Sequence, residues 1–324
     1  MRPPALPPPL RPGDRVELVA ASSALEGSER LEAGRRVLRS WGLEVGDSAA
    51  LLGRRWGYLA GRDAERAADL APGAPGEPGE PGEPAGRRVP LLACVRGGWG
   101  AARLLPEPSH PLPAWLETNP SPQWLLGFSD VTSLLWARWA RGWAGGVHGP
   151  LLTTLASEPL WSQERLRDLL FGRGVAPLAG EGWVGGVGEG PLLTANLTVA
   201  THLLGTPHLP DLRGAIVVFE DVGEAPYRLE RMLTHWRLSG ALRQLAGLGL
   251  GSFSGCVDSD RDGEPEETRF SAEQVLRERT ADLGIPVVAN LPVGHTPGNA
   301  ALPVGAWARL DGDAGRLEVD ACWG

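Results

Sequence analysis

Short apolar runs alternate with stretches of helical spacing along the first half of the chain. The run at 89–95 is almost continuously apolar, which is typical of a parallel strand buried on both faces. Further strands are expected at 15–20, 43–45 and 124–126, and helices at 28–41, 62–70, 101–105 and 131–140. This alternation predicts an α/β domain with a doubly wound parallel sheet (flavodoxin-like) over residues 1–160.

The second half of the chain is richer in strands, and its pattern is mixed. Strands are expected at 214–221, 251–257, 286–290, 304–310 and 316–321, and helices at 194–204, 227–236 and 242–248. We therefore predict a strand-rich mixed α/β domain over residues 191–324. A short helix at 161–171 and a glycine-rich stretch at 172–190 form the predicted linker, residues 161–190.

Residues 72–86 contain Gly-Glu-Pro three times in succession. So much glycine and proline suits no packed structure, and the repeat is far too short for collagen. We predict a disordered surface insertion here.

The amino-acid composition argues against several classes of partner and site. The chain has 324 residues, a formal net charge of −8 and no lysine, which argues against nucleic acid as a main partner because phosphate binding needs a basic face. Its three cysteines (Cys94, Cys256 and Cys322) are far apart, which argues against a disulfide framework or a zinc ribbon. We see neither a signal peptide nor a membrane span, and therefore expect a cytoplasmic protein.

The segment Gly127-Phe-Ser-Asp130 joins an apolar run to a predicted helix. A serine at such a turn exposes its hydroxyl above the sheet edge, as in a nucleophile elbow. The usual second glycine is missing, since Val131 occupies its position. Helix capping by Ser129 or Asp130 is the alternative interpretation.

The segment Arg96-Gly-Gly-Trp-Gly100 follows the buried strand at 89–95. Glycines allow positive φ and close backbone approach, so this turn could present free N–H groups to an oxyanion. A plain tight turn is the alternative.

Three further residues are candidates for acid–base chemistry. His295 follows a predicted strand in a loop rich in glycine and proline, and His148 is the rival base. Glu220 ends an apolar strand, so we expect it to be partly buried beside a cationic or N–H partner, with an arginine ion pair as the alternative.

The stretch Asp258–Gly263 imitates the start of a calcium-binding EF-hand loop. Arg269 stands where that loop needs a glutamate, so a solvated acidic loop is the better interpretation.

Taken together and in order, these motifs resemble the L,D-carboxypeptidase family of serine peptidases, which includes muropeptide L,D-carboxypeptidases and microcin C immunity peptidases. The resemblance runs from about Pro12 to Val319. The motifs are Arg96–Gly100, Gly127–Asp130, Val147–Pro150, Asn196-Leu197, Gly205–Pro207, Phe219–Val222, Pro226–Met232 and Gly294-His295.

The resemblance implies a Ser–His–Glu triad at a domain interface. Ser129 would be the nucleophile, His295 the general base and Glu220 the carboxylate that orients it. The backbone N–H groups of Gly98 and Asp130 would form the oxyanion hole. It also implies a homodimer that uses no metal and no cofactor.

The activity expected from this resemblance is hydrolysis of the L,D-peptide bond before a terminal D-alanine of peptidoglycan tetrapeptides, in murein recycling. Two alternatives remain: a peptidase or amidase that detoxifies a peptidyl-nucleotide antibiotic, and a peptide-binding module without activity. The candidate substrate contacts are Arg96, Trp99, Asn196 and Arg231, with Arg228 as another carboxylate anchor.

Three departures from the family pattern bear on substrate preference. Ala21-Ser22 replaces Pro-Ser, Trp99 replaces a tyrosine, and Ala195 replaces a glycine. The diamino acid that precedes the D-alanine is left open.

Overall fold

The computed structural model describes residues 5–71, 89–107, 113–117, 122–258 and 269–320. The insertion predicted at 72–86, Cys322 and most of the acidic stretch Asp258–Gly263 lie outside the described residues. None of the helices in the described part of the chain is long and apolar enough to cross a membrane.

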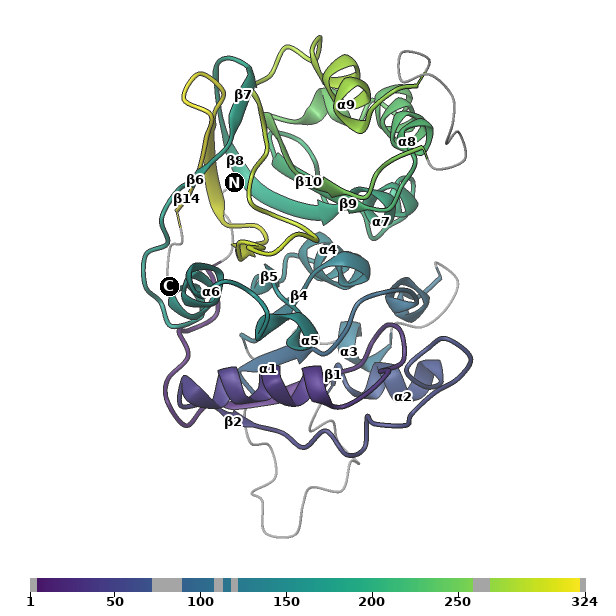
Figure 1. Ribbon diagram of the computed structural model, residues 1–324, viewed down its shortest axis with the longest axis vertical. Coiled ribbons are helices and arrows are strands. Elements are labelled where there is room, and N and C mark those ends of the chain that lie inside the picture. Colours follow the sequence, from purple (N-terminus) through teal and green to yellow (C-terminus); the bar gives the residue numbers. More distant parts are fainter. Residues whose placement is uncertain (1–4, 72–88, 108–112, 118–121, 259–268, 321–324) are drawn as a thin grey trace.

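The first half of the chain builds five strands of a six-stranded sheet (Figure 1). The five strands from the first half are parallel and follow the order 2-1-3-4-5, which confirms the predicted doubly wound domain. In sheet order the strands are β12 (Leu302–Pro303), β5 (Gly146–His148), β4 (Trp124–Gly127), β3 (Leu91–Cys94), β1 (Arg15–Val19) and β2 (Glu44–Val45).

Helices cover both faces of this sheet, which explains why β3 is apolar throughout. Leu91 and Ala93 face one apolar cluster, and Leu92 and Cys94 face the other. The helices are α1 (Glu29–Ser40), α2 (Asp63–Ala68), α3 (Ala114–Glu117), α4 (Thr132–Ala140), α5 (Leu152–Leu155) and α6 (Leu160–Leu170), with 3-10 turns η1 (Ala101–Leu104) and η2 (Ser129–Val131).

Helices α1 and α5 approach very closely at Gly34. A β-carbon on Gly34 would lie 1.9 Å from the carbonyl oxygen of Leu152. We expect Gly34→Ala to lower the free energy of unfolding by about 2–3 kcal/mol, because the helices must separate to admit the methyl group. Urea unfolding would measure this, with Gly27→Ala as the control, since nothing lies within 4 Å of a β-carbon there. Equal stabilities of the two variants would contradict the expectation.

The second half builds an eight-stranded mixed sheet, as predicted for a strand-rich domain. Its four central strands are parallel and its flanking strands are antiparallel. In sheet order they are β6 (Leu178–Ala179), β14 (Arg316–Asp320), β13 (Trp307–Asp311), β8 (Val187–Asn196), β9 (Ile216–Val222), β10 (Gly247–Ser254), β11 (Val287–Ala289) and β7 (Glu181–Val184). Its helices are α7 (Leu197–Leu203), α8 (Pro226–Leu238) and α9 (Ala272–Thr280), with the 3-10 turn η3 (Leu242–Gln244).

Helix α4 lies between the two sheets and joins their cores (Figure 1). Its Trp136 donates from Nε1 to the carbonyl of Thr194 over 3.1 Å and meets Trp236 edge to face. One continuous apolar cluster runs from β3 through α4 to Phe219 of the second sheet. The two halves are therefore packed as one body.

The segment 161–190, predicted as a linker, includes the helix expected at 161–171 and also short strands. It contains α6, β6, β7 and the start of β8. Three of its glycines, Gly182, Gly188 and Gly190, are strand residues, and a β-carbon on Gly190 would lie 1.8 Å from the carbonyl oxygen of Gly214. Glycine is required here because the two backbones touch, a reason that loop statistics alone do not reveal.

Two helices expected from the sequence, at 194–204 and 242–248, are shorter in the structure. Residues 194–196 end β8 before α7 begins, and 247–248 open β10 rather than continue a helix. Strand β12 comes from the second half of the chain but completes the first sheet, where Leu302 pairs with His148.

Candidate active site

Ser129 lies at the sharp turn that joins β4 to α4. Its φ is +62°, a left-handed conformation that is uncommon for residues other than glycine. Gly127 makes the turn possible, because a β-carbon there would lie 2.8 Å from Cγ1 of Val131. The turn thus has the backbone strain of a nucleophile elbow, although Val131 occupies the position of the second glycine.

Asp130 fixes this turn from inside the protein. Its carboxylate is 2% exposed, and Oδ2 accepts a hydrogen bond from the N–H of Ala101 over 2.8 Å. Burial raises the pKa of Asp130, although this N–H and Ser22 oppose the shift. The Asp130 side chain therefore ties the serine turn to the glycine-rich turn before η1.

The glycine-rich turn at 96–100 lies directly against Ser129. A β-carbon on Gly97 would be 3.1 Å from Cβ of Ser129 and 3.3 Å from its hydroxyl oxygen. Gly98 and Gly100 have φ of +107° and +115°. Ser23 holds the turn by accepting the N–H of Trp99 over 3.0 Å.

His295 and Glu220 reach Ser129 from the second sheet. Nε2 of His295 lies 3.1 Å from the Ser129 hydroxyl oxygen, and Nδ1 lies 2.6 Å from Oε2 of Glu220. Glu220 is fully buried near the end of β9, and this burial raises the pKa of its carboxyl against the opposing effect of the His295 hydrogen bond. Its partner is thus a histidine rather than an arginine.

The three side chains meet because the carboxyl ends of two sets of parallel strands face one another. Ser129 follows β4 of the first sheet, whereas Glu220 lies near the end of β9 and His295 follows β11 of the second sheet. The ring of Phe128 packs against His295 with centroids 4.7 Å apart. Ligands commonly bind at such strand ends in α/β proteins.

His148, the rival base, does not bond to Ser129. It is fully buried, and its ring meets Phe128 edge to face at 5.6 Å. Burial lowers the pKa of its imidazole to about 3, so the ring is neutral. No described protein atom hydrogen-bonds to either ring nitrogen.

Because His148 lacks a bond to the serine, His148→Gln should keep kcat/KM within about threefold of wild type. The free energy of unfolding should fall by about 1–2 kcal/mol, because the amide would bring hydrogen-bond donors and an acceptor into a fully buried site where no described protein atom pairs with the present ring. Steady-state kinetics and thermal unfolding would test both values. A His148→Gln protein that folds but has no activity would restore His148 as the base.

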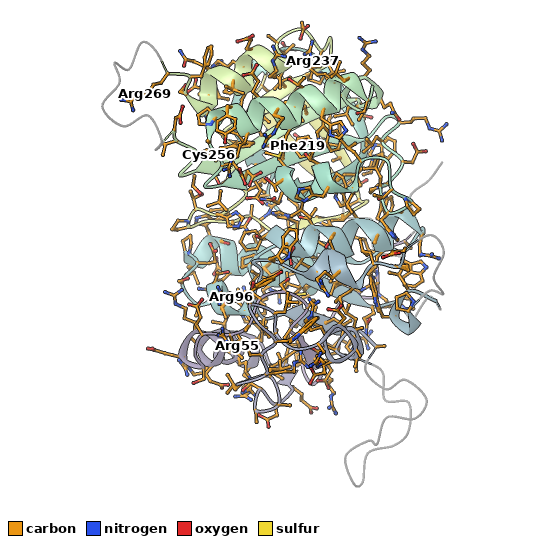
Figure 2. The ribbon with its side chains drawn as sticks, turned by 90° about the vertical axis from the view of Figure 1, so that its right-hand side faces the viewer. Arg55, Arg96, Phe219, Arg237, Cys256 and Arg269 are labelled. Atoms are coloured by element: carbon orange, nitrogen blue, oxygen red, sulfur yellow. The ribbon has the colours of Figure 1, made fainter. Side chains whose placement is uncertain are left out.

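The other candidate residues have different surroundings. Arg96 donates from Nη1 to the carbonyl of Ala24 and to Glu26, and Figure 2 shows it in the half of the molecule built on the first sheet. Trp99 is 46% exposed and lies edge to face with His202 of α7 at 6.2 Å. Both residues border the glycine-rich turn.

Helix α8 carries the remaining arginine candidates. Arg228 and Arg231 are exposed, and each lies 5.7 Å from the ring centre of Tyr227. Arg228 also contacts Glu224.

Asn196 is part of a buried polar cluster instead of an open surface. Its Oδ1 accepts the N–H of Val199 at the start of α7, and its Nδ2 donates to Asp221 over 3.0 Å. Asp221, which was not among the candidate site residues, also accepts hydrogen bonds from the N–H and hydroxyl of Thr198. The signal for Asp221 was present, because it is the second carboxylate at the end of an apolar strand.

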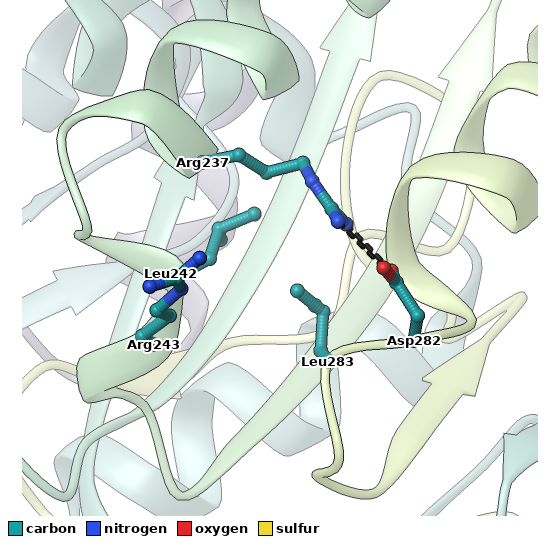
Figure 3. A pocket seen from close by; sticks show the side chains of 5 residues that line it. All are labelled: Arg237, Leu242, Arg243, Asp282 and Leu283. Atoms are coloured by element: carbon teal, nitrogen blue, oxygen red, sulfur yellow. Dashed lines mark hydrogen bonds and ion pairs between the residues drawn. The ribbon is translucent and has the colours of Figure 1, made fainter.

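A hollow of about 240 Å³ lies at the end of the second sheet opposite to the end that carries Glu220. Figure 3 shows the residues that line it. It is lined by Arg237, Leu242, Arg243, Asp282 and Leu283, and Arg237 pairs with Asp282. Helix α8 runs away from the Glu220 edge toward this hollow, so the hollow is separate from the serine. Within the described ranges, no three His, Cys, Asp or Glu side chains gather closely enough to hold a metal ion.

Comparison with known proteins matches both halves of the chain to domains of one family. Residues 16–74 and 85–149 match the LD-carboxypeptidase N-terminal domain, and residues 189–310 match the LD-carboxypeptidase C-terminal domain. A Synechocystis protein named as a carboxypeptidase is 47% identical, with 95% of each chain covered. The murein tetrapeptide carboxypeptidase of Pseudomonas aeruginosa is 35% identical, covering 92% of this chain and 94% of its own.

A solved structure has the same fold over nearly the whole chain. The muramoyltetrapeptide carboxypeptidase from Oxalobacter formigenes superposes with a TM-score of 0.77 at 28% identity, covering 94% of this chain and 97% of its own.

Proposed function

The chain belongs to the LD-carboxypeptidase family and is a peptidase, and on that premise we propose that it is a serine carboxypeptidase acting on murein tetrapeptides. The bond cleaved is the L,D-peptide bond before the terminal D-alanine. The names of the Pseudomonas and Oxalobacter relatives support this substrate. The observation that carries the serine mechanism is the line of contacts from Ser129 through His295 to Glu220.

In this proposal Ser129 is the nucleophile and His295 the general base. A serine hydroxyl is weakly nucleophilic until a base takes its proton, and Nε2 of His295 lies within hydrogen-bond distance of it. Glu220 accepts the N–H at Nδ1, which leaves Nε2 free to receive the proton. His295 then returns that proton to the leaving amine, and water releases the acyl group by the reverse sequence.

The backbone N–H groups of Gly98 and Asp130 are the proposed donors to the oxyanion. The closeness of the glycine-rich turn to Ser129 supports this assignment. Each such donor typically lowers the barrier by about 3 kcal/mol.

A carboxypeptidase must also bind the terminal carboxylate of its substrate. The forked guanidinium of Arg96 or Arg231 is suited to this, and exposed Trp99 offers an apolar contact. We assign Asn196 to positioning, because both ends of its side chain are engaged within the protein. From the family resemblance we also propose a cytoplasmic homodimer that needs no metal or cofactor.

Mass spectrometry of products tests the proposed function directly. The protein should convert a murein tetrapeptide into the tripeptide with release of one alanine, and should leave the tripeptide intact. An aminoacyl sulfamoyl adenylate, assayed beside it, tests the antibiotic alternative. Cleavage of the adenylate alone would overturn the murein assignment, and tight binding of tetrapeptide without turnover would support the binding module.

A further inference from the structure

His295 lies on a closed loop, residues 292–300, which we call the His295 loop. The N–H of Ala300 donates to the carbonyl of Pro292 over 2.8 Å and so joins the two ends. Inside the loop, Oδ1 of Asn299 accepts the N–H of Gly294 over 3.0 Å. Asn299 is 1% exposed, so it sets the backbone immediately before the histidine from a fixed position.

A second group of hydrogen bonds ties this loop to the first half of the chain. Oε2 of Glu158 accepts the N–H of Gly298 over 2.7 Å and the N–H of Asn299 over 3.1 Å. The hydroxyl of Ser162 donates to the carbonyl of Asn299 over 2.7 Å. Glu158 precedes α6 and Ser162 lies in its first turn, so both belong to the segment packed on the first sheet.

Glu158 and Gly298 are both closely surrounded where the loop meets the first half of the chain. Glu158 is 9% exposed, and burial raises the pKa of its carboxyl against the opposing effect of the two loop N–H groups. Gly298 has φ of +100°, and a β-carbon there would lie 2.7 Å from the ring of Trp161. Burying a carboxylate costs free energy unless the group is hydrogen-bonded. Packing of α6 alone therefore does not explain why a carboxylate is placed on these two N–H groups.

We propose that Glu158 is a positioning residue, which holds the His295 loop so that Nε2 of the histidine stays within reach of the Ser129 hydroxyl. The serine and its base come from different sheets, and Glu158 links the sheet that carries the serine to the loop that carries the base. This inference rests on the proposed function, because it takes His295 as the base.

Substitutions at Glu158 separate positioning from general stability. Glu158→Ala leaves two N–H groups without their acceptor, so the loop should shift and kcat should fall about 10- to 100-fold, with KM within about twofold. Glu158→Gln places an amide oxygen at the same point and should recover kcat to within about threefold. Glu158→Asp withdraws the acceptor by one methylene and should resemble the alanine variant.

The rate of covalent modification of Ser129 provides a second measurement, which does not depend on the peptide substrate. Phenylmethylsulfonyl fluoride modifies a serine in proportion to its activation by the base, so the rate of Ser129 modification should fall with kcat in Glu158→Ala. Measurements should be made well below the midpoint of thermal unfolding of each variant. Glu164→Ala is the matched control, because Glu164 is exposed on α6, the helix that Glu158 precedes. Ser162→Ala removes one of the loop bonds and should lower the rate about 3- to 10-fold.

The outcomes distinguish this inference from the proposed function. Reduced labelling in Glu158→Ala with recovery in Glu158→Gln supports positioning. If the wild type is labelled at Ser129 and folded Glu158→Ala is labelled equally fast, the positioning role is wrong. Should Glu158→Ala fail to fold, an unchanged rate in Ser162→Ala overturns it instead. If the wild type is neither labelled at Ser129 nor active on tetrapeptide, the proposed function itself fails.

Discussion

Replacing Ser129 with alanine should lower kcat for alanine release by about 10⁵- to 10⁶-fold, leaving only what binding and the oxyanion donors supply. The change isolates the hydroxyl, because alanine keeps the β-carbon and therefore the same strained φ of +62°. KM and the midpoint of thermal unfolding should stay close to wild type. Quantitative mass spectrometry of tetrapeptide and tripeptide over long incubations can measure a loss of this size.

The control for Ser129→Ala is Ser40→Ala. Ser40 is exposed at the end of α1, where its hydroxyl bonds only to the carbonyl of Val37 among the described residues. That variant should keep full activity. Wild-type rates in Ser129→Ala would remove the serine from the mechanism, and with it the roles given to His295 and Glu220.

Glu220→Gln should lower kcat by about 10⁴-fold although the side chain keeps its shape. A carboxylate accepts a hydrogen bond from the N–H at Nδ1 of His295, whereas an amide NH₂ in the same place donates to that nitrogen. The imidazole then carries its proton on Nε2 and cannot accept one from Ser129. The kinetic loss should therefore lie in kcat, with KM little changed.

The same substitution should raise stability near neutral pH. Because burial raises the pKa of Glu220, the folded protein holds this proton more tightly than the unfolded chain does. The contribution of the carboxyl to stability therefore falls as pH rises from the ordinary value of 4.5 through the raised value. The unfolding midpoint of Glu220→Gln should exceed that of wild type at pH 7–8, and the difference should shrink toward pH 4.

Exposed Glu29→Gln is the matched control for both measurements. It should change neither kcat nor the pH dependence of the unfolding midpoint. Full activity in Glu220→Gln would mean that another group orients His295. A loss of stability that grows with pH would contradict the sign expected from burial.

The sequence predicted the first sheet well because its strands β3, β4 and β5 are buried on both faces. The run at 89–95 has no polar position that would place it anywhere but inside, and the structure forms β3 there. The helix expected at 28–41 begins at Glu29. Serine is a common N-cap residue, but Ser28 satisfies no N–H with its side chain, because its own backbone is already helical.

The contacts between distant segments could not be predicted from the residues alone. His295 and Ser129 are 166 positions apart, and no local pattern states that they meet. The family resemblance assigned both residues to one site, and the structure shows that they are in contact. The bond from Glu158 to Asn299 spans 141 positions and carries no motif, so only the fold reveals it.

The glycine-rich stretch at 172–190 contains strands that its composition did not indicate. Gly188 and Gly190 suggested a linker, yet each lies in β8 against the backbone of a neighbouring segment. Glycine is used both where a chain must bend and where two chains must touch. Sequence composition does not distinguish these two uses.

The short strand β12 has a consequence for how this protein is made. Residues 302–303 complete the sheet that carries Ser129, so the first half of the fold waits for a segment near the far end of the chain. His295, the proposed base, precedes that strand by only a few residues and follows Ser129 by 166 positions. A chain that has been synthesised past Ser129 therefore still lacks the proposed base, and we expect peptidase activity only after His295 and β12 have joined the fold.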